Sequence, residues 1–477
     1  MTVDACILPA TTTDRSSIGQ AIVTIDILPD DVLLEIFTVY LGTDIQVEKW
    51  HGLIHVCRRW RHIVFASPRR LDLQLVCTPR RRVKEMLDVW PALPLVIRCD
   101  LSVWTWVKAD NVIAALKHND RVCQILWDYF SISSSLLEGI VAVMQEPFQV
   151  LTDLRIIAWD KLEETVFPEE FLGGSAPRLR SCDLWGIAFP GIWKLLLTAN
   201  HLVNLSLWNI PHSGYIPPEA MVMCLSATPN LENLSLGFRS PRSRPGQADR
   251  SPPPPTRVVL PALTCFRFKG VSEYLEDLVS RIGIPLLDNV EITFFHQLIF
   301  DTPRLHEFLA RAEAFKAPSR ANVAFSKDIV CFDLESRLSL RVTCTKLDCQ
   351  LSSMAQLCSL SLPRISTLER LDIREGNMPR PYWQDDVDSP RWLEFLRPFT
   401  ALRDLYLDKK IAPRVVLALK ELIGGPGAVT EELPALQRLV VEEVPTSGPV
   451  QEVIGQFVAV RQLSGRPVAI HSWVGRS

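Results

Sequence analysis

The sequence predicts an α/β protein in which a small helical module precedes an irregular solenoid of strand and helix units. Two observations support this fold class. First, a six-residue phrase of the form apolar-x-x-apolar-x-apolar returns ten times between Val122 and Val441, mostly at intervals of 23 to 34 residues. Second, the stretch before these phrases carries apolar residues at helical spacing. A repeat of this length is typical of stacked units and not of one packed domain.

The clearest copies of the phrase are Leu151 to Ile156, Leu179 to Leu184, Leu202 to Leu207 and Leu231 to Leu236. Each copy predicts a short strand whose alternate side chains point inward, followed by a loop and a helix that return the chain to the next strand. One interval, of 81 residues, leaves space for two atypical units around the segments ANVAF and LSLRV. Because one unit cannot bury its own apolar face, we expect the units to stack.

The chain is expected to contain three regions. These are a disordered leader over residues 1–24, a helical module over residues 25–75 and the solenoid over residues 76–477. Residues 237–256 interrupt two repeats with a stretch rich in Pro, Arg and Ser. Such a composition cannot bury apolar area, so we expect a disordered loop insertion there.

Composition argues against several classes of protein. Fifty-one Lys and Arg residues against 54 Asp and Glu residues give a net charge of -3, so no whole-molecule field attracts nucleic acid or anionic lipid. The chain has no run of about eighteen apolar residues, and we expect no membrane span. Its twelve cysteines are scattered singly, with Cys344 and Cys349 the closest pair. We interpret them as reduced thiols, which predicts a cytoplasmic or nuclear protein.

The helical module is too apolar to stand alone. Its first helix carries an apolar stripe, and further apolar residues lie off that stripe, which predicts burial on more than one side. A second segment, ending at Pro68, shows another stripe with several arginines mainly on its other faces. Two helices in fewer than fifty residues cannot bury this surface, so a partner or the repeats must cover the remainder. The two stripes are Val32, Leu33, Ile36, Phe37 and Tyr40, and Val56, Cys57, Trp60, Ile63 and Val64.

An ordered set of short motifs in this module resembles the F-box. The pattern runs through Leu28-Pro29-Asp30-Asp31, Leu33 with Ile36-Phe37, Val56-Cys57-Arg58-Arg59-Trp60 and Ser67-Pro68. The tryptophan that many members carry after Ser-Pro is absent, and Arg69 stands there. The repeats that follow resemble leucine-rich repeats without the asparagine ladder, so the solenoid should be irregular. The combination resembles the fungal F-box proteins with degenerate leucine-rich repeats.

This resemblance implies a substrate receptor of a Skp-cullin-F-box ubiquitin ligase. The F-box would dock on the Skp-type adaptor and, through it, on the cullin, while the repeats would select an unknown protein for ubiquitination. Such a receptor performs no chemistry, so we expect no catalytic residue, cofactor or metal. The alternative is a repeat scaffold or a nucleic-acid-binding protein that does not act through the ligase. The expected adaptor-binding residues are Leu28, Pro29, Val32, Leu33, Ile36, Phe37, Cys57 and Trp60.

Substrate recognition is expected on the strand face of the solenoid. In each phrase, the residues just before and just after the last apolar position point away from the core. This rule places Trp185 and Trp208 at equivalent positions of adjacent units, and Arg267 and Lys269 two to three units away. These four residues are our candidate substrate site, suited to an acidic or phosphorylated peptide. The alternative is that irregular packing or the segment 237–256 covers the two tryptophans.

Other motifs are weak evidence for nucleic-acid, metal or phosphate binding. Nine Lys or Arg residues and one acidic residue lie between positions 56 and 84, but they share helices with apolar residues and lack an aromatic platform, so we do not expect nucleic-acid binding. His51 and His55 have the spacing of helical zinc ligands but lack the glutamate of a His-Glu-x-x-His motif. Asp385, Asp386 and Asp388 lack an EF-hand framework, and the glycines at 424–427 lack the Lys-Ser of a phosphate loop.

Overall fold

The computed structural model describes residues 25–42, 48–80, 83–99, 106–130, 134–158, 165–241, 257–315, 318–362, 364–376, 389–421, 433–442 and 449–473. The chain divides into two compact units, Met1–Leu75 and Val76–Ser477. The expected leader and residues 242–256 of the expected loop lie outside the described residues. Gly237 and Phe238, assigned from sequence to that loop, instead end a strand, because Phe238 packs against Phe268 and Tyr274. Within the described ranges, no helix has the length and apolar character needed to cross a membrane.

The first unit is helical. It contains a 3-10 turn η1 (Ile25–Ile27) and the helices α1 (Asp30–Leu41), α2 (Trp50–Ile54) and α3 (Arg58–Ala66). Leu33, Leu34 and Phe37 of α1 are buried, whereas Val32 and Ile36 are exposed. The face of α1 that is buried within this unit includes Leu34, whereas Val32, Ile36 and Tyr40 of the expected stripe lie on its exposed side. Because the helix is almost wholly apolar, its sequence pattern does not show which apolar residues face the core of the unit.

The segment expected to form the second stripe is two helices. Its break lies at His55 and Val56, and Val56 is 58% exposed there instead of contributing to the core. Cys57 caps α3, because the backbone N–H of Trp60 donates to its Sγ at 3.5 Å. The largest buried side chain of this unit is Trp50, 1% exposed, whose Nε1 donates to the carbonyl of Gln74 at 3.1 Å. Trp60, only partly exposed, lies 4.8 Å from the Phe37 ring.

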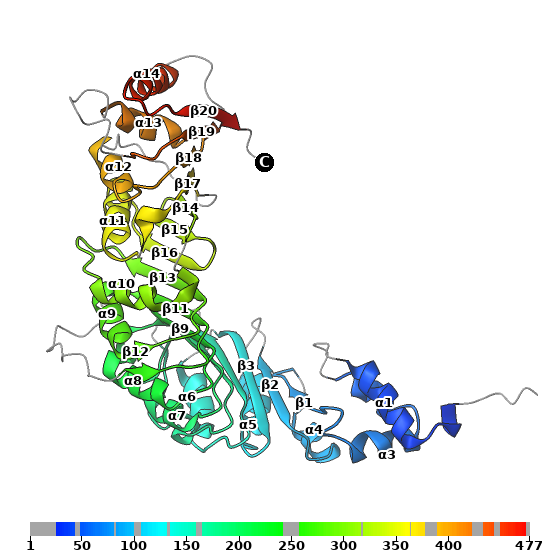
Figure 1. Cartoon of the computed structure of the whole chain (residues 1–477). Helices are drawn as coiled ribbons and strands as arrows, with labels where there is room; N and C mark the ends of the chain where they lie inside the picture. The colour runs from blue at the N-terminus through cyan, green and yellow to red at the C-terminus, as the bar shows by residue number, and fades with distance from the viewer. Residues whose placement is uncertain are drawn as a thin grey trace, which may run out of the picture. The chain divides into compact units, whose positions relative to one another are not determined.

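The second unit is a long, mostly parallel sheet with helices along one side (Figure 1). The described strands of the main sheet follow the order β1 (Leu75–Cys77), β2 (Leu95–Cys99), β3 (Val122–Phe130), β4 (Asp153–Ala158), β6 (Ser181–Trp185), β8 (Asn204–Ile210), β9 (Asn233–Phe238), β11 (Cys265–Gly270), β13 (Asn289–Phe295), β16 (Leu338–Thr343), β15 (Ile329–Leu334), β14 (Arg320–Phe325), β17 (Arg370–Glu375), β18 (Asp404–Leu407), β19 (Arg438–Glu442) and β20 (Ala469–Trp473).

The helices that accompany these strands are α4 (Val83–Val89), α5 (Trp106–Leu116), α6 (Ser134–Val143), α7 (Ile192–Thr198), α8 (Pro218–Ser226), α9 (Ser272–Arg281), α10 (Pro303–Arg311), α11 (Leu347–Leu360), α12 (Ser389–Leu396), α13 (Ala412–Glu421) and α14 (Pro449–Leu463). Short strands β5 (Thr165–Val166) with β7 (Ile187–Ala188), and β10 (Val258–Val259) with β12 (Ile282–Gly283), form two separate pairs. Short 3-10 turns complete the described elements: η2 (Phe171–Gly174), η3 (His212–Gly214), η5 (Glu313–Phe315) and η6 (Ile365–Thr367).

The repeated phrases form the strands as the alternation predicts. In β6, Cys182 and Leu184 are buried while Asp183 and Trp185 are partly exposed, and Leu184 pairs in register with Leu207 of β8. The apolar side chains therefore stack from unit to unit as one core, and the polar positions line the opposite face of the sheet. The expected α/β solenoid is thus present in the second unit.

The 81-residue interval is built differently from the expectation. The segments ANVAF and LSLRV do form strands, β14 and β16, each parallel to its neighbour in the solenoid. They are not separate strand and helix units, however, because β15 runs antiparallel between them. A tight turn at Glu335 and Ser336, with φ of 48° and 60°, folds β16 back beside β15. As a result β16 lies next to β13, and the chain order of these strands is reversed within the sheet.

Candidate functional site

An apolar surface lies on one face of α1. Val32, Ile36, Val39 and Tyr40 are 43%, 40%, 80% and 54% exposed, and their spacing places them on one side of the helix. Across the helix, Leu33 and Phe37 are fully buried. The predicted adaptor-binding set therefore divides into core residues and surface residues. Leu33 and Phe37 belong to the core, Pro29, Val32 and Ile36 are exposed, and Leu28, Cys57 and Trp60 are partly exposed.

Three arginines after Val56 contact other parts of the first unit. Arg59 donates through Nη2 to Asp30 Oδ1 at 2.6 Å and to the carbonyl of Leu28 at 2.6 Å. Arg61 donates through Nε to the carbonyl of Ile54 at 3.1 Å, and Arg70 forms an ion pair with Glu35. Exposed pairs of this kind contribute little stability individually. Their geometry nevertheless directs much of the positive charge toward α1 and α2.

Three further motifs from the sequence are the histidine pair, the acidic stretch and the glycine-rich stretch. His51 packs edge-on against the Trp50 ring at 4.0 Å, and His55 is exposed just beyond α2. The acidic residues at 385–388 and the glycines at 424–427 lie outside the described residues.

Trp185 and Trp208 are neighbours on the strand face. The two residues pair in register between β6 and β8, and their ring centroids lie 6.2 Å apart with planes at 35°. Both side chains are partly exposed. Gly237 of β9 allows this arrangement, since a Cβ atom there would lie 2.7 Å from the Trp208 ring. The two tryptophans thus form an aromatic pair on the strand face, with Gly237 beside Trp208.

The two predicted basic residues follow on β11. Lys269 pairs in register with Gly237, the residue that lies against the Trp208 ring, so Lys269 is on the next strand beyond Gly237. Its Nζ lies 5.6 Å from the Phe295 ring, and burial lowers the pKa of its ammonium group. Arg267 is exposed and pairs with Glu291 at 3.6 Å. The four candidate substrate residues therefore share one face of the sheet, on β6, β8 and β11, with β9 between β8 and β11.

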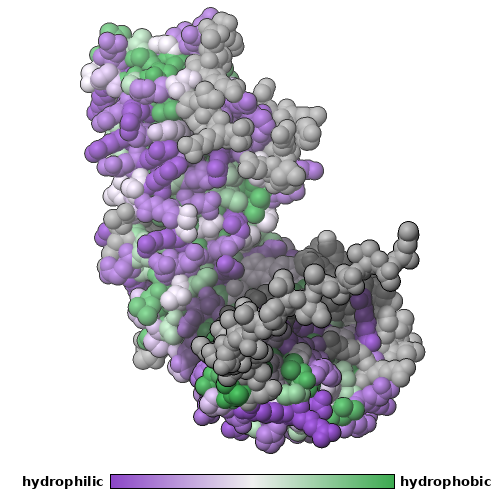
Figure 2. Space-filling view, turned by 90° about the vertical axis from the view of Figure 1, so that its right-hand side faces the viewer, coloured by the Kyte–Doolittle hydropathy of each residue, from purple (hydrophilic) through white to green (hydrophobic). Residues whose placement is uncertain are grey.

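Sequence reasoning missed a charged groove farther along this face. Figure 2 shows that hydrophilic side chains dominate the part of the visible surface over the later strands. Two adjoining depressions, of about 700 and 710 Å³, share Arg320, Asn322, Asp372 and Arg374. We call their combined lining the charged groove. Its cationic residues are Arg267, Arg320, Arg337, Arg341, Arg370, Arg374, Lys409 and Lys410, and its acidic residues are Glu291, Asp333, Glu335, Asp372, Glu375, Asp408 and Glu442.

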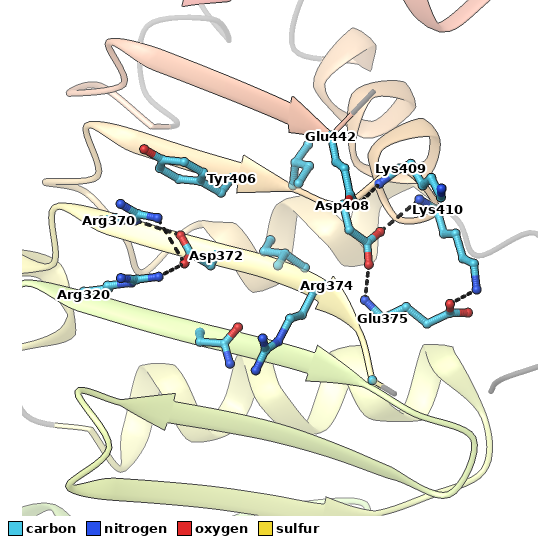
Figure 3. A pocket seen from close by; sticks show the side chains of 14 residues that line it. Arg320, Arg370, Asp372, Arg374, Glu375, Tyr406, Asp408, Lys409, Lys410 and Glu442 are labelled. Carbon is cyan, nitrogen blue, oxygen red and sulfur yellow. Dashed lines mark hydrogen bonds and ion pairs between the residues drawn. The ribbon is translucent and has the colours of Figure 1, made fainter. Parts of the chain in front are cut away.

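Most charges in the groove are paired. Arg320 and Arg370 both contact Asp372, at 2.5 and 2.9 Å, and the Arg370 guanidinium lies 3.7 Å from the centroid of the Tyr406 ring (Figure 3). Arg374 is exposed and lines both depressions of the groove (Figure 3). Pairing fixes the side chains in place, and Arg374 offers a guanidinium for a bidentate contact with a carboxylate or phosphate.

The far end of the groove is formed by Asp408. Its carboxylate accepts from the backbone N–H groups of Lys410 and Ile411 at 2.9 and 2.7 Å, just before α13, and from the N–H of Glu375. Lys410 in turn forms an ion pair with Glu375. The strand ends of β17 and β18 are therefore tied together. The signal in the sequence that indicates this groove is the alternation of the charged residues Arg370, Asp372 and Arg374 with the apolar residues Leu371 and Ile373.

The repeat phrase and its parallel stacking define the class of protein, a solenoid of leucine-rich-repeat-like units. A leucine-rich repeat-containing protein from Legionella pneumophila, LegL7, is similar in structure, with 14% sequence identity and a TM-score of 0.27. The similarity covers 83% of this chain and 99% of that protein. No family model matches the chain, and no curated protein matches it.

Proposed function

We propose that this chain is a substrate receptor of a Skp-cullin-F-box ubiquitin ligase. The observation that carries the proposal is the exposed apolar face of α1, formed by Val32, Ile36, Val39 and Tyr40. It lies in a unit whose motifs resemble the F-box. Burying a large apolar side chain stabilises a complex by about 1.5 to 3 kcal/mol, so four such side chains can support specific docking. The occupant that we propose is the Skp-type adaptor.

The architecture of the first unit supports this role. Phe37 and Trp60 pack together behind the exposed face, and Arg59 ties α3 to the turn before α1. A docking helix held in this way loses little conformational freedom on binding. The same contacts occupy Arg59, Arg61 and Arg70, which weakens the alternative of a nucleic-acid-binding protein.

The strand face of the second unit is the proposed substrate surface. Trp185 and Trp208 supply rigid aromatic contacts, and the charged groove supplies oriented donors and acceptors on neighbouring strands. Aromatic and arginine side chains are the common anchors of protein interfaces. Together with Arg267 and Lys269, this surface suits a segment of a protein substrate that carries apolar and acidic residues.

Affinity purification of the tagged full chain, with the proteasome inhibited, tests the proposal. We expect mass spectrometry to recover a Skp-type adaptor and a cullin with the wild-type chain. Trp185→Ala combined with Trp208→Ala should keep both of these proteins and lose most other partners. Recovery of salt-sensitive nucleic acid without an adaptor would favour the scaffold or nucleic-acid alternative instead.

A further inference from the structure

Two cysteines and a histidine converge at the ends of two paired strands. His296 follows β13, Cys344 follows β16, and Cys349 lies in the first turn of α11. One nitrogen of His296 and the two Sγ atoms all lie within 4.8 Å of one another. Phe295 pairs in register with Thr343, which brings the residues that follow them together although 48 positions separate them in sequence. The cluster is therefore a product of the strand pairing.

We propose that His296, Cys344 and Cys349 bind a zinc ion that joins the ends of β13, β16 and α11. Thiolate and imidazole are the ligands that zinc prefers, with bonds of about 2.0 to 2.3 Å, so ligand atoms on one ion lie roughly 3.3 to 3.8 Å apart. The cluster needs to close by about 1 Å to reach this separation. Its cysteines are only partly buried and its histidine is exposed, so side-chain rotation suffices.

The neighbouring residues hold this cluster in place. Gln350, fully buried, donates through Nε2 to the carbonyl of Cys344 at 2.6 Å and to that of Ser326 at 2.8 Å. The N–H of Cys344 donates to the carbonyl of Asp328 at 3.0 Å. On the other side, Gln297 hydrogen-bonds both Glu273 and the N–H of Ser272, which fixes the chain directly after His296. Ligand positions fixed in this way are a feature of metal sites in proteins.

The cluster supplies three protein ligands among the described residues. A water molecule would occupy the fourth position of a tetrahedral zinc site.

The position of the site suggests its purpose. The site joins the ends of β13 and β16. β13 is the last strand before the reversed segment, and β16 forms a hairpin with β15 and pairs with β13. Both strands also contribute residues to the charged groove, among them Glu291 and Arg341. Zinc would therefore fasten the place where the regular repeat is interrupted and stiffen that wall of the groove. This inference does not depend on the proposed ligase function.

Metal analysis of the reduced full-length protein tests the inference. We expect one zinc per chain after purification, and expect cobalt substitution to give the visible bands of tetrahedral coordination with a thiolate-to-cobalt charge-transfer band. Cys344→Ser, Cys349→Ser and His296→Gln should each lose the zinc. His296 is exposed, so its variant should fold even if a cysteine variant does not. Adding zinc to metal-free wild-type protein should raise its Tm, whereas His296→Gln should not respond.

Matched variants outside the cluster provide the control. Cys331→Ser on β15 and His306→Gln on α10 remove the same residue types and should retain the zinc. Failure of the reduced wild-type protein to bind zinc or cobalt would overturn the inference. Zinc binding that survives all three cluster substitutions would also overturn it. A Cys344–Cys349 disulfide in protein from a reducing cytosol, with no metal bound after its reduction, would contradict it equally.

Discussion

Replacing Gly237 with alanine tests whether Trp208 is held in a fixed position on the strand face. The added Cβ atom would lie 2.7 Å from Cδ2 and Cε3 of the Trp208 ring. Carbon atoms pack at about 3.5 to 4.0 Å, so the ring must move by about 1 Å. Such a movement disturbs its contact with Trp185, whose ring centroid lies 6.2 Å away. Overpacking of this kind costs about 1 to 3 kcal/mol, and we expect that loss in the free energy of unfolding.

A double-mutant cycle assigns this loss to the indole. In a Trp208→Ala background the clash is absent, so Gly237→Ala should change stability by less than about 0.5 kcal/mol. Denaturant unfolding of the four full-length proteins measures both values. Ser235→Ala, on the same strand and partly exposed, should be nearly neutral in both backgrounds. An equal loss with and without Trp208 would refute the packing that we describe.

Two further predictions concern stability. Trp50→Ala should destabilise the first unit by about 3 to 5 kcal/mol, because this side chain is 1% exposed and donates a hydrogen bond to the carbonyl of Gln74. Trp60→Ala should cost less, because Trp60 is partly exposed. Hydrogen exchange of α1 to α3 measures both losses, and equal losses would contradict the assignment of Trp50 as the main core residue. The N–H and hydroxyl of Ser319 donate to Glu335 and, led by the N–H, lower the pKa of its carboxyl group. Because the pKa of Glu335 is lower in the folded protein than in the unfolded chain, its ionised carboxylate stabilises the fold. This stabilisation is complete above the ordinary glutamate pKa and is lost as the pH falls through the folded pKa. Glu335→Gln should therefore lower Tm at about pH 7, and its difference from the wild type should disappear once the pH falls below the folded pKa of Glu335; a pH-independent difference would exclude this origin.

Part of this fold follows directly from the sequence. The strands of the clear repeats are predictable because alternate residues of a strand face opposite sides, and equal spacing then brings Trp185 and Trp208 into register. The segment 329–334 was not predicted, because its alternation resembles that of its neighbours and its antiparallel direction depends on the turn at Glu335. The sequence also did not show which apolar residues of α1 face the core of the unit, since apolar residues surround that helix and packing against α3 selects the buried face.

The candidate site depends more strongly on long-range pairing. The groove brings Arg320 and Asp372 together from segments that are 52 residues apart, because β14 pairs with β17. The cluster of His296 and Cys344 likewise depends on the pairing of β13 with β16, against the order of the chain. Periodicity specifies which side of a strand a residue occupies, but not which distant strand lies beside it. The apolar surplus of the first unit, by contrast, was visible in the composition of residues 32–41 alone.

Binding of the purified full chain to a purified Skp-type adaptor tests the central claim most directly. Ile36→Asp places a charge on the exposed face of α1 without altering the buried Leu33 and Phe37. An unpaired charge buried in an interface costs at least about 2 kcal/mol, which weakens binding by about 30-fold or more. Leu298→Asp, at a residue 84% exposed in the second unit, is the matched control. We predict that Ile36→Asp abolishes adaptor pull-down with unchanged circular dichroism and that Leu298→Asp retains it. Undiminished pull-down by Ile36→Asp would contradict the account.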